Sequence, residues 1–525
     1  MSSSFSASQS YRSTRSEVDQ AVSFEEAVIT GLAKDGGLFI PSVIPKLPSD
    51  FLTSWNQFSF QELAFNIMRL YISVKEISDE DLKKLIKDSY STFRTNEITP
   101  LVKLNSVKNL YLLELFHGPT YAFKDVALQF VGNLFEFFLN RKNENISNES
   151  EKNSITVVGA TSGDTGSAAI YGLRNKANVS VFILYPTGRI SQIQELQMTT
   201  VNDANIHTLS VNGTFDDCQN VVKKVFNDTE FNDKYHIGAV NSINWARILA
   251  QITYYFHSYF QLKNQLPEDE RNNFKIKFIV PSGNFGDILA GFYAKEMGLP
   301  IEQLIIATNE NDILDRFLKT GNYDKSSEVN ATYSPAMDIL ISSNFERLLW
   351  YMVKQTDGEN NDNKTGAILA QFMLNLLSPK GVFSVSKETL AKTREIFDSF
   401  KITNDETVST IKKIYQENNY IMDPHTSVGV TAALKKISQD DEKTQGNFKY
   451  ISMSTAHPAK FSQVVNKSLT GLEGYDFENK VLPEAFKKFD SLPKKVRLVE
   501  SADLKLIETV IVQELENEKL AKNSN

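Results

Sequence analysis

The residue best suited to covalent chemistry in this sequence is a lysine with apolar neighbours. Lys124 follows a Gly-Pro turn in LFHGPTYAFKDVALQ, close to Phe116, Tyr121 and Phe123. Apolar residues then recur at helical spacing as far as Phe138 and cover most of the circumference, which predicts a buried helix with Lys124 near its amino-terminal end. Burial and the positive end of the helix dipole both favour the neutral amine. A neutral lysine amine is a nucleophile toward aldehydes.

Two glycine turns at predicted strand-to-helix junctions are candidate anion sites. TSGDTG (161–166) follows ITVVGA, and SGNFGD (282–287) follows KIKFIVP. The first amides of a helix lack partners within the helix, and small residues let an anion approach them. Neither turn has the spacing of a nucleoside-triphosphate or dinucleotide motif. Each alone is compatible with simple capping, but their shared place at the carboxyl ends of strands favours ligand binding.

Simpler interpretations stay open for the other polar residues. Lys124 can extend to solvent beside Asp125, as lysines commonly do. The segment YISMSTAH, which contains Thr455, is also typical of an ordinary strand and turn. The six histidines have no metal-ligand spacing, and the one cysteine, Cys218, excludes an intramolecular disulfide and a thiolate zinc cluster. No metal site is predicted.

The elements that must position these residues form a regular alternation. From residue 153 onward, short β-branched runs (ITVVGAT, SVFILYP, IHTLSV and KIKFIVP) alternate with helical segments, including an aromatic-rich helix over 246–262. This alternation predicts an α/β protein with a mostly parallel sheet covered by helices. A final strand (KVRLVE) and a charged helix follow residue 494. Three polar stretches, at 140–153, 356–365 and 439–447, are predicted to be exposed loops.

The composition excludes several functional classes. The chain has 525 residues with 56 basic and 64 acidic side chains, a net charge of −8, which argues against a nucleic-acid or anionic-membrane binder. No apolar run is long enough to cross a bilayer, and the low cysteine content favours a reducing, cytoplasmic location. Residues 1–16 are rich in Ser and contain two Arg, a composition shared by mitochondrial transit peptides; we interpret them as a short disordered leader.

These segments, in this order, resemble the threonine synthases of fungi and bacteria, which are pyridoxal-phosphate enzymes with the tryptophan synthase β fold. The motifs that carry the resemblance span nearly the whole chain: YRSTR from Tyr11, DGGLF from Asp35, LFHGPTYAFKDVALQ from Leu115, VVGATSGDTGSAA from Val157, YPTGRISQIQELQM from Tyr185, PSGNFGD from Pro281 and STAHPAKF from Ser454. The HGPTxAFKD segment is the most specific of them. The resemblance implies a fold-type II pyridoxal-phosphate enzyme with two mostly parallel sheets flanked by helices, plus a small N-terminal domain.

The resemblance also implies the roles of individual residues. Lys124 binds the cofactor covalently, and the hydroxyl of Thr455 faces the pyridine nitrogen. The turn at 162–165 holds the substrate carboxylate, although relatives often have Asn where this chain has Asp164, so that side chain is in doubt as a ligand. Arg189 is our own candidate for the substrate phosphate, argued from the affinity of guanidinium groups for phosphate. The full expected set is Lys124, Gly283, Asn284, Phe285, Gly286, the amide of Asp287 and Thr455 for the cofactor, and Ser162, Thr165 and Arg189 for the substrate.

The implied reaction converts O-phospho-L-homoserine and water into L-threonine and phosphate by γ-elimination and β-hydration, with Lys124 moving protons. One alternative is a phospholyase that releases α-ketobutyrate from the same substrate. A dehydratase, a cysteine-synthase-like enzyme and a non-catalytic binding protein of the same fold are further alternatives. Because the long N-terminal extension of the effector-regulated plant enzymes is absent, we expect an unregulated monomer.

The expected domains are a small N-terminal domain over 1–100, a cofactor-binding catalytic region of two intertwined α/β subdomains over 101–495, and a C-terminal helix and tail over 496–525.

Overall fold

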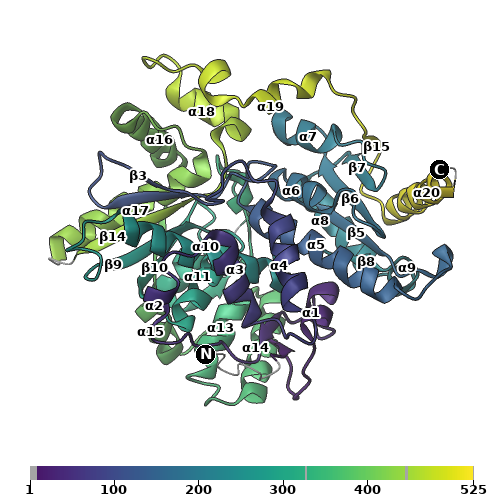
Figure 1. Cartoon of the computed structure of the whole chain (residues 1–525), viewed down its shortest axis with the longest axis horizontal. Coiled ribbons are helices and arrows are strands. Elements are labelled where there is room, and N and C mark those ends of the chain that lie inside the picture. Colours follow the sequence, from purple (N-terminus) through teal and green to yellow (C-terminus); the bar gives the residue numbers. More distant parts are fainter. Residues whose placement is uncertain (1–8, 326–327, 444–446, 524–525) are drawn as a thin grey trace.

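The protein folds around two β-sheets with central helices between them (Figure 1). The computed structural model describes residues 9–325, 328–443 and 447–523. The first sheet consists of β3 (Leu101–Lys103), β4 (Leu110–Glu114), β9 (Lys275–Pro281), β10 (Ile301–Thr308), β13 (Phe397–Lys401) and β14 (Phe448–Ser454). The second consists of β5 (Ile155–Ala160), β6 (Val179–Pro186), β7 (Ile206–Val211), β8 (Ile237–Gly238) and β15 (Arg497–Val499).

Both sheets are essentially parallel. In the described part of the chain, the first sheet has the order β13-β10-β9-β14-β4-β3, and only β3 pairs in the antiparallel sense. The second has the order β15-β7-β6-β5-β8, with every pair parallel. Strands such as β7 are buried along their whole length, as expected for a parallel sheet covered on both faces. The predicted α/β fold with two mostly parallel sheets is confirmed.

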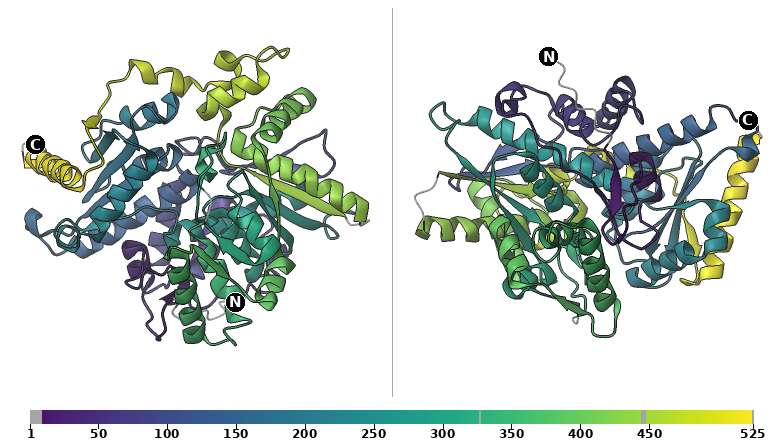
Figure 2. Two further views of the ribbon diagram at one scale, coloured as in Figure 1. Left: turned by 180° about the vertical axis from the view of Figure 1, so that it is seen from behind. Right: turned by 90° about the horizontal axis from the view of Figure 1, so that it is seen from below.

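Two long helices lie between the sheets and form the centre of the molecule (Figures 1 and 2). They are α5 (Lys124–Asn143) and α10 (Trp245–Gln265), in which every side chain from Trp245 to Phe260 is buried. Their apolar circumference requires contacts on all sides. Against the first sheet, α11 (Gly286–Met297), α12 (Ile313–Thr320) and α15 (Lys387–Ile396) pack on one face, and α16 (Asn404–Asn418) and α17 (Pro424–Lys443) cover the other.

The N-terminal segment packs onto the same central core. It contains β1 (Tyr11–Ser13), β2 (Phe39–Pro41), α1 (Phe24–Thr30), α2 (Phe51–Ser54), α3 (Phe60–Arg69) and α4 (Asp79–Tyr90). The rings of Tyr11 and Trp245 lie 5.8 Å apart. The prediction of a disordered leader is wrong for residues 11–16, because Tyr11 is fully buried and Arg15 forms an ion pair with Glu346 (2.8 Å). Residues 1–8 of that prediction lie outside the described residues.

The predicted polar loops are partly helical. Helix α5 continues to Asn143, α14 (Asp362–Leu377) begins within 356–365, and α17 continues to Lys443. Asn361 caps α14 by accepting a hydrogen bond from the Lys364 amide (2.9 Å). These stretches are polar because they contain solvent-exposed helix ends, and the sequence analysis therefore predicted loops where helices continue. Residues 444–446 lie outside the described residues.

The C-terminal segment completes the second sheet. Strand β15 pairs with β7, and α20 (Leu504–Asn523) packs on α8 (Phe215–Asn227), where Ile507 and Ile511 contact a cluster that includes Cys218. Burial raises the pKa of the Cys218 thiol to about 11, so this side chain serves in packing. The predicted final strand and helix are confirmed. None of the described helices is both long and apolar enough to cross a membrane.

The remaining described elements connect these layers: α6 (Asp164–Leu173), α7 (Gln192–Thr199), α9 (Thr229–Tyr235), β11 (Asn322–Asp324), β12 (Val382–Ser384), α13 (Phe345–Lys354), α18 (Ser462–Leu469) and α19 (Glu484–Lys487).

Candidate active site

Lys124 and Thr455 are brought together by a short antiparallel contact. The segment before Lys124 pairs with the segment that follows β14: the amide of Phe123 donates to the Thr455 carbonyl (2.8 Å), and the amide of His457 donates to the Tyr121 carbonyl (3.0 Å). Two residues that lie 331 positions apart in the sequence are thereby held at one edge of the first sheet.

Lys124 is buried at the first position of α5, with 9% of its surface exposed. Burial lowers its pKa to about 8, with Asp164 opposing the shift and Arg247 and Lys460 adding to it. The alternative in which Lys124 extends to solvent is therefore wrong. An amine with a pKa near 8 is present in both neutral and protonated forms near neutral pH, as a group that accepts and returns protons requires.

The loop before Lys124 is held by an arginine that the sequence analysis missed. Arg94 donates to the carbonyl of Phe116 (2.6 Å) and to that of Gly118, and its guanidinium stacks 3.4 Å from the centre of the Tyr121 ring. Tyr121 has a left-handed backbone (φ 61°), which other contacts must stabilise. The order of this loop therefore depends on a residue that lies 30 positions before Lys124.

Asp125 explains the small residues of the HGPTxAFKD motif. Its carboxylate accepts hydrogen bonds from the amide (2.8 Å) and hydroxyl (2.6 Å) of Thr120. A Cβ atom at Gly118 would lie 2.4 Å from the Cβ of Asp125, so glycine is required there. Burial raises the pKa of Asp125 to about 6 despite the hydrogen bonds from Thr120. The motif is thus specific because it forms a turn around one buried carboxyl group.

The glycine turn at 283–287 has the geometry of an anion cradle. The Gly283 carbonyl accepts from the Ser342 hydroxyl (2.6 Å), and the Asn284 carbonyl accepts from the Asn344 amide (3.1 Å). Because a trans peptide places its C=O and N–H groups on opposite sides, these bonds direct the following amides away from residues 342–344. Phe285 is left-handed (φ 63°) and precedes α11, and no described residue accepts from the amides of 285–287. Such a run of free amides at a helix start binds phosphate.

The surroundings of Gly283 leave room for a ligand but not for a side chain. A Cβ atom there would lie 3.0 Å from the Cα of Met337, so the backbone of 336–337 closes one side of the turn. His425 holds this backbone in place, since its Nε2 accepts from the Ala336 amide (3.1 Å). The free amides of this turn fit a phosphate group, and the buried amine of Lys124 fits an aldehyde, so the residues present suit a cofactor that carries both groups.

The second glycine turn precedes α6 and carries a buried ion pair. Asp164 lies 2.9 Å from the ammonium of Lys460, whose side chain is completely buried, and accepts from Gln194 (2.8 Å). Burial alone would raise the pKa of Asp164, but Lys460, Lys124 and Gln194 together lower it well below its usual value. Lys460 also donates to the carbonyl of Thr120 (2.7 Å), which links this turn to the loop before Lys124.

The other predicted substrate ligands differ in their burial and in their distance along the chain from the Asp164 ion pair. Ser162 and Thr165 are half-buried beside the Asp164 ion pair. Arg189 is exposed in the loop after β6, where its charge, after the hydrogen bonds from Thr214, contributes to the lowered pKa of Asp217. No contact in the described part of the chain joins Arg189 to Lys124 or to either glycine turn. Hydrogen bonds and one ion pair thus join Thr455 and the turn at 162–165 to the loop before Lys124.

Thr455 is positioned by a polar network at the start of α17. Its amide donates to the hydroxyl of Thr426 (3.2 Å), and Thr426 in turn donates from its amide to the fully buried carboxylate of Asp423 (3.1 Å). The sequence analysis missed both residues, because no local pattern connects them to Thr455.

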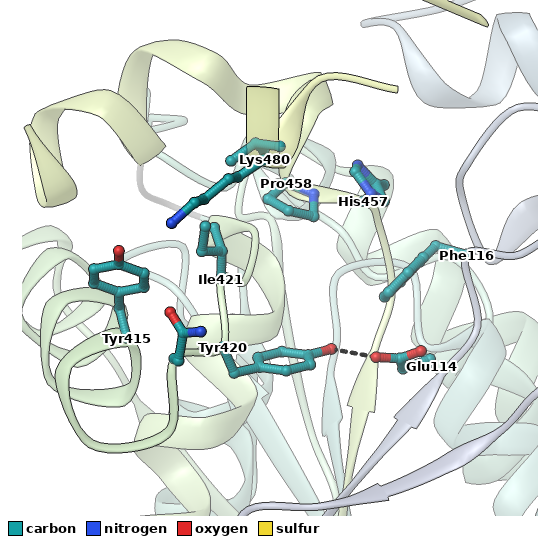
Figure 3. Close-up of a pocket in the computed structure, with 10 residues that line it drawn as sticks. Glu114, Phe116, Tyr415, Tyr420, Ile421, His457, Pro458 and Lys480 are labelled. Carbon is teal, nitrogen blue, oxygen red and sulfur yellow. Dashed lines mark hydrogen bonds between the residues drawn. The ribbon is translucent and has the colours of Figure 1, made fainter. Parts of the chain in front are cut away.

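A pocket of about 350 Å³ adjoins this site at the carboxyl ends of β4 and β14. Figure 3 shows Tyr420 joined to Glu114, and Phe116 next to His457, with their ring centroids 5.5 Å apart. The Tyr420 hydroxyl donates to Glu114 Oε1 (2.8 Å). Among the described residues, none of those predicted from sequence as cofactor or substrate ligands lines this pocket.

Comparisons with known proteins agree with this geometry. Residues 10–90 match the family profile "Threonine synthase N terminus", residues 93–365 match "Pyridoxal-phosphate dependent enzyme", and residues 426–511 match "Threonine synthase, C-terminal". A threonine synthase of Saccharomyces cerevisiae is 60% identical over 521 residues, which cover 98% of this chain and 99% of the relative.

Two solved structures are also similar over nearly the whole chain. A crystal structure of threonine synthase from yeast superposes with a TM-score of 0.92 at 59% identity, covering 97% of this chain and 99% of that one. A pyridoxal-phosphate-bound threonine synthase from Brucella melitensis superposes with a TM-score of 0.84 at 39% identity, with the same coverage.

Proposed function

The chain belongs to the threonine synthase family and is a pyridoxal-phosphate-dependent threonine synthase, and from this premise we propose that it acts on O-phospho-L-homoserine, with Lys124 as its cofactor-binding and proton-transferring residue. The observation that supports this role most directly is a buried lysine amine whose pKa is lowered to about 8 by that burial.

We propose that the cofactor phosphate is held by the amides of the SGNFGD turn. The support is the orientation of the Gly283 and Asn284 carbonyls, which directs the amides of Asn284 and Phe285 away from residues 342–344, and the lack of an acceptor among the described residues for the amides of Gly286 and Asp287. The side chain of Asp287 is used elsewhere, since it accepts from the hydroxyls of two tyrosines of α10.

Thr455 is proposed to hydrogen-bond the ring nitrogen of the cofactor through its hydroxyl. A neutral hydroxyl partner does not hold a proton on that nitrogen as a carboxylate would. Its place beside Lys124, fixed by the Phe123 amide, supports this role.

For the substrate, we propose that the hydroxyls of Ser162 and Thr165 bind the carboxylate together with the amides of Asp164 and Thr165, which have no acceptor among the described residues. The amides of Gly163 and Gly166 are already used, since both donate to the Thr161 hydroxyl. The carboxylate of Asp164 is committed to Lys460 and Gln194, so it is a partner of a buried cation and not a ligand of an anionic substrate. Arg189 stays a prediction for the substrate phosphate, and its exposure in the loop after β6 offers it no support.

The work of the protein in the reaction is to move protons and exclude water. When bound, the cofactor supplies an electron sink for carbanions at the α- and β-carbons of the substrate. Lys124 Nζ takes and returns protons at these carbons, since its pKa allows both forms. The loop before Lys124, which contains Phe116, Tyr121 and Phe123, limits the access of water to the site. Water is therefore added only at the β-carbon of the substrate.

The experiment that tests this function is product analysis with O-phospho-L-homoserine. The holoenzyme is expected to release phosphate and threonine in equal amounts, and Lys124→Ala is expected to abolish turnover. The matched control is Lys142→Ala, an exposed lysine at the far end of the same helix, which is expected to retain activity. Formation of α-ketobutyrate and ammonia in place of threonine contradicts the proposed outcome and indicates a phospholyase.

The expected domain limits of 1–100, 101–495 and 496–525 stay as proposals, as do a monomeric state and a cytoplasmic location. Light scattering of the purified holoenzyme tests the oligomeric state, and a fluorescent fusion tests the location.

A further inference from the structure

Asp423 is a fully buried carboxylate at the amino-terminal end of α17. It accepts hydrogen bonds from the amides of His425 (3.1 Å) and Thr426 (3.1 Å), as a helix-capping residue does. Elsewhere in the chain a neutral hydroxyl is sufficient for this purpose, as at Ser59 of α3 and Ser78 of α4. No lysine or arginine in the described part of the chain forms an ion pair with Asp423. Because a buried carboxylate without a cation is costly, its charge indicates a role beyond capping.

The Thr426 hydroxyl joins Asp423 to Thr455. It lies 3.2 Å from Asp423 Oδ2, and because a carboxylate only accepts, the hydroxyl proton is directed toward Asp423. The oxygen of the same hydroxyl then accepts from the Thr455 amide (3.2 Å). On its other side, the Thr455 carbonyl accepts from the Phe123 amide (2.8 Å), one residue before the cofactor lysine. The backbone of Thr455 is therefore held from both sides, and one of these contacts depends on Asp423.

The imidazole of His425 extends from Asp423 in a second direction. Its Nε2 accepts from the Ala336 amide (3.1 Å), so the ring proton lies on Nδ1. Nδ1 is buried, has no hydrogen-bond partner among the described residues and lies 3.5 Å from Asp423 Oδ1. The negative charge of Asp423 thus favours the tautomer that accepts from Ala336. The centre of the Phe461 ring, 4.7 Å from that of the imidazole, fixes the orientation of His425.

Ala336 belongs to the backbone that borders the SGNFGD turn. It is the second residue of a short 3-10 helix, Pro335–Met337, and the first amides of such a helix have no acceptor within it. His425 supplies that acceptor. A Cβ atom at Gly283 would lie 3.2 Å from the Ala336 carbonyl oxygen and 3.0 Å from Met337 Cα. The place of Gly283 therefore depends on where His425 holds this backbone.

We propose that Asp423 is a positioning residue that holds both ends of the cofactor site at once. Through Thr426 it places Thr455, the proposed partner of the ring nitrogen. Through His425 it places the backbone beside the SGNFGD turn, the proposed phosphate cradle. This inference rests on the proposed function, because those roles define the two ends. One buried charge thereby sets the spacing that a pyridine ring with a phosphate arm requires.

The test compares two ligands, pyridoxal phosphate and pyridoxal, in the cofactor-free full chain. Each is titrated and followed by its visible absorbance. The affinity for pyridoxal reports on the ring end, and the ratio of the two affinities reports on the phosphate end. Asp423→Asn retains a capping side chain of the same size and removes the charge. It is expected to weaken pyridoxal binding about three- to tenfold and to lower the preference for pyridoxal phosphate by a similar factor.

Each of the two connections has its own variant. Thr426→Val removes only the hydroxyl and is expected to weaken both ligands by the same factor and to shift the absorbance maximum of bound pyridoxal phosphate. Thr426→Ser keeps the hydroxyl and should restore both values. His425→Leu is expected to lower the preference for pyridoxal phosphate about three- to tenfold, with little change in the affinity for pyridoxal.

The matched control is Thr431→Val on the same helix. The Thr431 hydroxyl is also buried, and it donates to the Ser427 carbonyl (2.7 Å), so it belongs to neither connection. This variant is expected to leave both affinities and the absorbance maximum unchanged.

The proposal is overturned if Asp423→Asn leaves both quantities unchanged or changes only one of them. Should this variant not fold, Asp423→Ser, which provides the same cap as Ser59, takes its place and is judged by the same two quantities. A failure of the proposed function appears instead in the product assay, with these binding equilibria intact.

Discussion

The pairing of Asp164 with Lys460 gives the Asp164 carboxylate a role within the protein. A completely buried ammonium needs a negative charge, and the Asp164 carboxylate provides it at 2.9 Å. The same pair joins the start of α6 to the loop before Lys124 through the Thr120 carbonyl. Asp164 and Lys460 are therefore positioning residues, and they set the charge near Lys124.

Breaking this pair from one side is expected to destabilise the protein strongly. Asp164→Asn leaves Lys460 as a buried ammonium without a counter-charge and is expected to cost about 3 to 5 kcal/mol in urea unfolding of the holoenzyme. Lys460→Met is expected to have a cost of the same order. The double variant removes both charges, so its cost should be smaller than the sum by more than about 1 kcal/mol.

The control for this cycle is an exposed pair of the same chemistry. Lys84 and Asp88 lie 2.6 Å apart on the surface of α4, and Asp88→Asn is expected to cost less than about 1 kcal/mol. Strictly additive costs for the Asp164 and Lys460 variants would contradict a functional ion pair.

The lowered pKa of Lys124 predicts how cofactor binding depends on pH. Only the neutral amine attacks the cofactor aldehyde, and its fraction rises as pH approaches a pKa of about 8 from below. The rate at which cofactor-free enzyme recombines with pyridoxal phosphate should therefore rise about tenfold per pH unit below pH 8 and level off above it. Stopped-flow absorbance measures this rate.

A rate that continues to rise to pH 10 would show that Lys124 titrates like an exposed lysine. Because the charge of Lys460 adds to the lowering, Lys460→Met should move the midpoint to higher pH. An unchanged midpoint in this variant would show that the charge of Lys460 does not affect the pKa of Lys124.

At the scale of elements, the site depends on how closely α5 and α6 approach each other. A Cβ atom at Gly132 would lie 1.9 Å from the Gly172 carbonyl oxygen, and one at Gly172 would lie 2.4 Å from the Leu128 carbonyl oxygen. These two helices carry Lys124 and Asp164 at their first positions. A pair of glycines thus sets the distance between the lysine and the second glycine turn.

Gly132→Ala is expected to force α5 and α6 apart and to lower stability by about 3 kcal/mol, because the obstructing atoms belong to the backbone. The Michaelis constant should rise as well, since the substrate turn moves away from Lys124. The matched control is Gly159→Ala in β5, where the new methyl group would meet Ile183 at 3.6 Å, an ordinary contact. Equal stabilities of the two variants would show that α5 and α6 can move apart without a cost in the free energy of unfolding.

Local patterns were sufficient to predict residues whose role follows from their neighbours in sequence. The apolar flanks of Lys124 predicted its burial, and the strand-to-helix glycines predicted the free amides at 285–287. Arg247 and Lys460 were not found, because what makes them important is the lack of solvent around them. Arg94 was not found, because what makes it important is its contact with the distant loop before Lys124. Arg189 was chosen for its charge alone, and a charge in a loop carries no information about burial.

At the scale of the whole molecule, segments that lie far apart in the sequence pack in the same layer of the fold. Ile511 of the C-terminal helix is fully buried against the second sheet, and Leu506 of the same helix is 36% exposed. Ile511→Ala should therefore cost about 2 to 4 kcal/mol in thermal unfolding, whereas Leu506→Ala should cost less than about 1 kcal/mol. A smaller effect for Ile511 would mean that α20 is only loosely attached.

The net charge of the chain and the charge of the groups buried around Lys124 have opposite signs. The chain carries a net charge of −8, yet the buried cations Lys124, Lys460 and Arg247 meet only two carboxyl groups, those of Asp164 and Asp125. A negatively charged surface does not attract a phosphorylated substrate, so its retention depends on the local amides and buried cations.

The position of β15 has a consequence for the synthesis of this protein. Strand β7 is complete near residue 211, but its neighbour β15 is translated only at residues 497–499. At about 5 to 20 residues per second, the ribosome leaves the edge of β7 unpaired for tens of seconds. An open strand edge, with unpaired backbone N–H and C=O groups, is a template for pairing with other nascent chains. The time before the C-terminus emerges is thus the interval in which this enzyme is most exposed to aggregation and has most need of a chaperone.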